Sequence, residues 1–78
     1  MLVSEQIKAA RSLLDWTAKD LANKSGISLA TIQRMESPGG TDNALGKNLS
    51  SVQAVLEKGG VIFIMTDNIG GPGVRLKK

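Results

Sequence analysis

Helix boundary signals between Thr17 and Ser28 constrain the fold more than any other feature of this sequence. Thr17 and Asp20 have the [ST]-x-x-[DE] spacing of a capping box, in which each side chain accepts a hydrogen bond from the other residue's backbone N–H. Gly26 ends the helix that begins there, because glycine readily adopts the left-handed conformation that turns a chain sharply. Ser28 then caps another helix over residues 29–36. The sequence therefore predicts two short helices joined by a tight turn.

Apolar periodicity predicts one helix before this pair and one after it. The first covers residues 4–14, where spacings of four, three and four place Val3, Ile7, Ala10 and Leu14 on one helical face. The second covers about residues 48–58, and its apolar positions are Leu49, Val52, Val55 and Leu56. Gly59 and Gly60 follow it and end the helix.

The pattern changes to that of strands after Gly60. Residues 61–65 are β-branched, aromatic or otherwise apolar, and residues 74–77 alternate apolar and basic side chains. The turn-rich segment 67–73 separates them and predicts a C-terminal β-hairpin. Because an isolated hairpin is marginally stable in water, we expect it to dock on the helices or to pair with another chain.

The two capped helices have the spacing of a helix-turn-helix motif. Ala22 is small where the helices would cross, Gly26 makes the turn, and Ile32 is the buried anchor of the second helix. Residues 17–36, within the wider segment 4–36, closely resemble the Cro/C1 (XRE) family of phage-type and bacterial repressors. The resemblance implies a mainly α fold, a four-helix lambda-repressor-like helix-turn-helix domain, here followed by two short C-terminal strands.

The resemblance also implies a structural ion pair, between Arg11 on the first helix and Glu36 at the end of the third. The chain differs from the family pattern at Ala18, where the family usually has a glutamine. It differs again at its C-terminus, where the hairpin takes the place of the family's fifth helix.

Base contacts are expected on the outward face of the helix over residues 29–36, near its start. With Ile32 and Met35 facing inward, the outward residues are Ser28, Leu29, Ala30, Gln33 and Arg34. Gln33 would pair with adenine and Arg34 with the O6/N7 edge of guanine, whereas Leu29 and Ala30 would touch thymine methyls. The alternatives are solvated Gln33 and Arg34 side chains, and a Leu29 that packs against a neighbouring loop. Ser28 is first of all a helix cap.

Phosphate contacts are predicted at Thr17, Lys19 and Lys47. Thr17 stands at the start of a helix, where a hydroxyl and free backbone N–H groups suit a phosphate, although its capping role alone explains the residue. Lys24 is interpreted as part of a solvated face.

Composition indicates one small domain that does not depend on metal or disulfide chemistry. The 78 residues are 41% hydrophobic, enough for one modest core, and contain no cysteine and no histidine. Thiolate ligands, the commonest metal ligand and the commonest general base are therefore missing. We expect a single domain over residues 1–78, with a helix-turn-helix core at 4–36, a loop and fourth helix at 37–58, and a hairpin at 61–77. We expect no enzyme, no catalytic residues, no cofactor and no metal.

A cytoplasmic location is expected, because secreted domains of this size usually depend on disulfides. The longest apolar run, residues 61–65, is strand-sized and far shorter than a membrane span, so no membrane partner is expected.

These patterns predict a sequence-specific DNA-binding transcription regulator, a repressor or autoregulator. One such module reads only a few base pairs, so we expect a homodimer on a palindromic operator in double-stranded DNA. The C-terminal hairpin is the candidate dimer interface. The alternative is a protein-interaction adaptor or antiactivator that keeps the helix-turn-helix fold but binds another regulator. It stays open because the net charge is only +3 and Ala18 stands where the family usually has glutamine.

Overall fold

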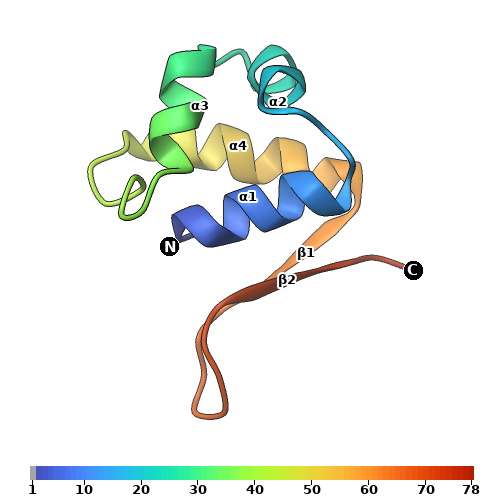
Figure 1. The fold of residues 1–78 in the computed structure, drawn as a ribbon. Coiled ribbons are helices and arrows are strands. Elements are labelled where there is room, and N and C mark those ends of the chain that lie inside the picture. The colour runs from blue at the N-terminus through green and yellow to red at the C-terminus, as the bar shows by residue number, and fades with distance from the viewer. Residues whose placement is uncertain (1) are drawn as a thin grey trace.

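Four helices and a β-hairpin follow one another along the chain in the predicted order (Figure 1). The computed structural model describes residues 2–78; Met1, with which the predicted domain begins, lies outside the described residues. The elements are α1 (Ser4–Leu13), α2 (Ala18–Ser25), α3 (Leu29–Met35), α4 (Gly46–Gly59), β1 (Val61–Ile64) and β2 (Gly73–Leu76). The predicted fold class, mainly helical with a two-stranded antiparallel C-terminal hairpin, is confirmed.

The elements form three layers (Figure 1). Helices α1 and α4 make the middle layer, with α2 and α3 on one side and the hairpin on the other. Helix α2 packs against α3 and α4, whereas β1 and β2 pack against the middle layer. The two helices of the helix-turn-helix pair are therefore separated from the hairpin by the full thickness of α1 and α4.

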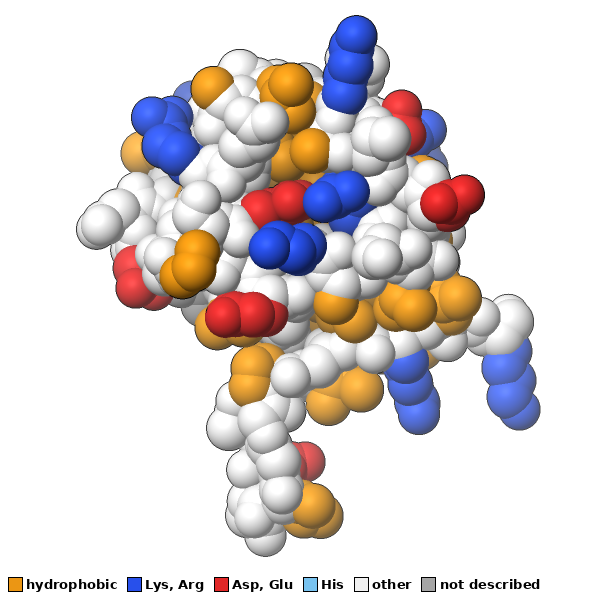
Figure 2. Space-filling model, in the orientation of Figure 1, with side chains coloured by type: hydrophobic (Ala, Val, Ile, Leu, Met, Phe, Trp, Pro, Cys, Tyr) orange, Lys and Arg blue, Asp and Glu red, His pale blue; other side chains and the backbone are white. Residues whose placement is uncertain are grey.

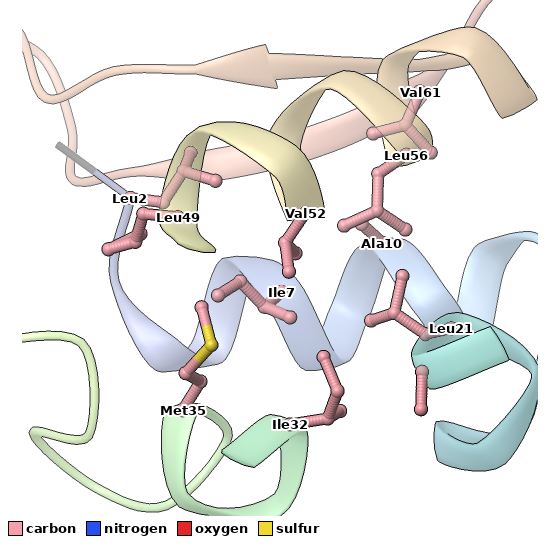
Figure 3. Close-up of a cluster of buried hydrophobic side chains, with 11 residues drawn as sticks. Leu2, Ile7, Ala10, Leu21, Ile32, Met35, Leu49, Val52, Leu56 and Val61 are labelled. Atoms are coloured by element: carbon pink, nitrogen blue, oxygen red, sulfur yellow. The ribbon is translucent and has the colours of Figure 1, made fainter. Parts of the chain in front are cut away.

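The hydrophobic core lies between the helices and receives side chains from all four of them and from β1 (Figure 3). Its buried members are Leu2, Ile7, Ala10, Leu21, Ala22, Ile32, Met35, Leu49, Val52, Leu56 and Val61. Val3 and Leu14, expected on the apolar face of α1, are only half buried. Leu2, just before the helix, is buried instead.

Helix α4 begins at Gly46, two positions before the predicted start. Its N-cap residue is Leu45, whose side chain makes no capping hydrogen bond. The backbone alone starts the helix, because the Leu45 carbonyl accepts from the N–H groups of Asn48 and Leu49 at 3.0 and 3.1 Å. A search for polar caps therefore misses this boundary.

The strand bounds differ from the prediction by one residue. The first strand ends at Ile64 instead of residue 65, and the second covers residues 73–76 instead of 74–77. The register pairs Val61 with Leu76 and Ile64 with Gly73. The ladder ends at Ile64, where the chain enters the turn-rich segment, so the prediction that the first strand reaches Met65 is wrong by one residue.

A buried glutamine on α1 fastens the hairpin to the helices. Gln6 is only 2% exposed, and its Nε2 donates to the carbonyls of Ile64 and Gly73 at 3.0 and 3.1 Å. Its Oε1 accepts from the Val3 N–H at 3.0 Å. One side chain thus satisfies the start of α1 and both strands, where a buried polar group without partners would be costly.

Candidate nucleic-acid interface

The turn between α2 and α3 is built by a glycine in the left-handed conformation. Gly26 has φ of 71°, and its N–H donates to the Ala22 carbonyl at 3.0 Å. The Ile27 N–H reaches the same carbonyl at 3.2 Å. On the core side, Leu21 and Ile32 are fully buried, so the turn and the shared core together fix how α3 is set against α2.

A reciprocal capping box starts α2. The Thr17 N–H donates to Asp20 Oδ2 at 2.9 Å, and the Asp20 N–H donates to Thr17 Oγ1 at 3.0 Å. The hydrogen bonds from Thr17, and then the charges of Lys24 and Lys19, hold the pKa of Asp20 below its usual range. Asp20 is therefore a carboxylate at neutral pH, and it suits the positive end of the α2 dipole.

The outward side of α3 is a continuous exposed surface, here called the α3 surface. Its members are Ser28, Leu29, Ala30, Gln33 and Arg34. All five residues predicted to contact bases are thus exposed together, while Ile32 and Met35 on the opposite side are buried. Leu29 is 38% exposed, and it does not belong to the core cluster.

Thr31 joins two members of the α3 surface, and sequence reasoning missed it. Ser28 Oγ accepts from the Thr31 N–H at 3.2 Å and donates to Thr31 Oγ1 at 2.9 Å. Arg34 Nη2 donates to the same Thr31 oxygen at 3.2 Å. The three residues are spaced three apart in the sequence. This spacing indicates a row of hydrogen-bonded side chains, because side chains three apart are neighbours on a helix.

The loop after α3 packs closely against it and leaves a hollow of about 490 Å³ beside Arg34. Gly40 is so near that a Cβ atom there would lie 1.8 Å from the Arg34 carbonyl oxygen. Asn43 and Asn48 line the same hollow as Thr31 and Arg34. Residues at the start of α4 and in the loop before it therefore border the α3 surface.

Arg11 and Glu36 form a two-pronged ion pair between α1 and the end of α3. Arg11 Nε and Nη2 donate to the Glu36 carboxylate at 2.8 and 3.0 Å, and Nη1 donates to the Trp16 carbonyl at 2.9 Å. The hydrogen bond to Glu36 raises the pKa of Arg11. Because Glu36 is only 8% exposed, removing Arg11 would leave a buried, unpaired carboxylate. The pair ties α1, α3 and the segment leading into α2 together.

The remaining cations of the candidate interface come from α2 and α4, the helices before and after α3 in the chain. Lys19, in the first turn of α2, and Lys47, in the first turn of α4, are exposed, and no ion pair within residues 2–78 engages either of them. Lys24 is exposed, as the sequence predicts, and it also makes a contact that sequence reasoning did not identify. Its Nζ lies 4.9 Å from the centre of the Trp16 ring, a cation–π contact that covers part of the half-buried indole.

Two further findings concern residues 2–78 as a whole. No three acidic, histidine or cysteine side chains among them gather closely enough to hold a metal ion. None of the helices is long and apolar enough to cross a membrane.

Neither a scan against protein-family models nor a search of curated proteins finds a match to this chain.

Proposed function

We propose that this protein is a sequence-specific DNA-binding transcription regulator that inserts α3 into the major groove of double-stranded DNA. The observation that supports this most is the α3 surface, an exposed helix face joined by a tight glycine turn to the capped helix α2. Helix-turn-helix proteins read bases with the N-terminal part of such a second helix. The resemblance to the Cro/C1 family supports the same proposal.

In this proposal the residues divide into base readers and phosphate anchors. Arg34 pairs with guanine and Gln33 with adenine, while Leu29 and Ala30 contact thymine methyls and Ser28 mainly caps the helix. Thr17, Lys19 and Lys47 hold the flanking phosphates. The protein acts in the cytoplasm by binding alone, as a repressor or autoregulator, with no catalysis, cofactor or metal.

Dimerisation belongs to the same proposal, because two recognition helices about 34 Å apart read a palindromic operator. The hairpin is the proposed interface. Val61 and Phe63 face the helices, so strand alternation turns Ile62 and Ile64 to the opposite side. Figure 2 shows hydrophobic side chains gathered where the hairpin meets the helical body, whereas charged side chains are scattered over the body itself.

One observation favours a second candidate function, an adaptor or antiactivator that binds another regulator. The hairpin and its turn expose large apolar side chains, at Ile64, Met65, Ile69 and Leu76. Such a surface also fits a protein partner of another kind. Ala18, where the family usually has glutamine, also removes one expected phosphate contact at the start of α2 and so weakens the case for DNA binding.

DNA selection followed by a salt titration separates the two functions. The full chain selects duplexes from a random library, and fluorescence anisotropy then measures the affinity for the enriched duplex at several salt concentrations. The regulator predicts enrichment and an affinity that falls steeply with salt, with a slope of about −0.9 per neutralised phosphate. No enrichment, together with a stoichiometric complex with a regulator protein, would support the adaptor and exclude the regulator.

A further inference from the structure

We propose that Thr31 is a positioning residue for Arg34, which holds the guanidinium in a fixed orientation on the α3 surface before DNA arrives. This inference rests on the proposed function, because its consequence is a sharper base preference at the position that Arg34 reads. Thr31 itself is half buried, between the exposed residues Ser28 and Arg34.

The hydrogen bonds around Thr31 fix its own side chain first. A hydroxyl offers two acceptor lone pairs, and both are used here, by the Ser28 hydroxyl at 2.9 Å and by Arg34 Nη2 at 3.2 Å. Ser28 is held in turn, because its Oγ accepts from the Thr31 backbone N–H at 3.2 Å. Threonine is also stiff about χ1, since it is branched at Cβ.

Anchoring Arg34 at one nitrogen leaves its other donors available. The guanidinium carries five N–H groups in a planar fork, and paired recognition of guanine needs two of them in parallel. Within residues 2–78, the Arg34 side chain makes a single hydrogen bond, and its partner is Thr31. No hydrogen bond joins it to Asn43 or Asn48, which line the same hollow, so Thr31 is the side chain that orients the guanidinium there.

A matched pair of substitutions separates positioning from helix stability. Thr31→Val keeps the shape and the branched Cβ but removes the acceptor, whereas Thr31→Ser keeps the hydroxyl. In both variants Ser28 can still accept from the backbone N–H of residue 31, so the cap of α3 persists. Circular dichroism checks that both variants remain folded.

The DNA measurement compares the selected duplex with one in which the guanine read by Arg34 is replaced. Thr31→Val is expected to lose about threefold to tenfold of this discrimination, the range of a typical net hydrogen bond, and Thr31→Ser is expected to retain it. In an Arg34→Ala background Thr31→Val should change nothing further. An additive loss in the double variant, or undiminished discrimination in Thr31→Val, would overturn the proposal.

A second measurement needs no DNA. Side-chain NMR of the free protein reports rotation of the Arg34 guanidinium, which is expected to be slow in the wild type and in Thr31→Ser and faster in Thr31→Val. Equal rotation in the wild type and Thr31→Val would overturn the positioning role, whatever the DNA result. Failure of the wild-type chain to bind any selected duplex would instead overturn the proposed function, and the base readout with it.

Discussion

Two glycines beside α3 are needed for different physical reasons. Gly26 has positive φ, but a Cβ atom built on it meets nothing within 4 Å, so only its backbone conformation is demanding. Gly40 is restricted by space, because an added Cβ would collide with the backbone carbonyls of Arg34 and Ser37. Sequence reasoning identified Gly26 as the end of a helix, but only the packed structure distinguishes a demand on conformation from crowding.

Alanine at these two positions should therefore have unequal effects on stability. Gly26→Ala is expected to lower the free energy of unfolding by about 1–2 kcal/mol, the cost of a left-handed alanine. Gly40→Ala should cost about 3 kcal/mol or more, since backbone atoms must move to make room. Urea denaturation measures both. Equal losses of unfolding free energy in the two variants would contradict the expectation that crowding at Gly40 costs more than the left-handed conformation at Gly26.

Residue-scale contacts also show where sequence reasoning ends. Burial of Ile32 and Met35 dictates that Gln33 and Arg34 face outward, because helical periodicity sets all four directions together. The role of Gln6 could not be predicted in this way. Its partners Ile64 and Gly73 lie 58 and 67 positions along the chain, and only the docked hairpin brings them to α1.

At the scale of elements, the polar caps of α2 and α3 placed the starts of these helices from the sequence, whereas the uncapped start of α4 could not be placed. Thr17 and Gly26 bound α2 as predicted, because each boundary has a local hydrogen-bonding cause. Helix α4 begins at Gly46 without a side-chain cap, so no local signal marks its start.

The capping box of α2 should contribute a pH-dependent term to stability. The pKa of Asp20 is lowered in the folded protein, chiefly by its hydrogen bonds with Thr17, so the unfolded chain binds the proton more tightly. The contribution is therefore fully present above the unfolded pKa of about 3.9 and is lost as the pH falls through the lower folded value.

Denaturation of the wild type and Asp20→Asn at several pH values isolates this term, because the other carboxyl groups titrate in both proteins. The difference between the two should be constant from pH 7 to about pH 5 and shrink below about pH 4. A difference that does not change with pH would contradict the role of the Asp20 carboxylate.

At the scale of the whole molecule, the layered arrangement separates the two proposed interfaces. The α3 surface lies on one side of the α1–α4 layer and the hairpin on the other (Figure 1). The sequence predicted that the hairpin docks on the helices or pairs with another chain. The structure buries Val61 and leaves Ile64 40% exposed.

A charge placed on the outer face of β1 should therefore separate the proposed dimer without unfolding the protomer. Ile64→Glu is expected to halve the mass measured by sedimentation equilibrium, because an isologous interface would bring two carboxylates close together. Ile69→Glu is the control, since Ile69 is 91% exposed in the turn beyond the paired strands. A wild-type chain that sediments as a monomer at high micromolar concentration, or an unchanged mass in Ile64→Glu, would contradict the hairpin interface.

Base discrimination by Arg34 tests the central claim, that the α3 surface reads DNA sequence. Affinities of the wild type, Arg34→Lys and Arg34→Ala are measured for the selected duplex and for the same duplex with the guanine replaced. Arg34→Lys keeps the charge but not the planar fork, so it should retain non-specific binding and lose about tenfold or more of the discrimination. Arg34→Ala should also cost about 1–3 kcal/mol of specific binding. Unchanged affinity and unchanged base preference in both variants would contradict the claim.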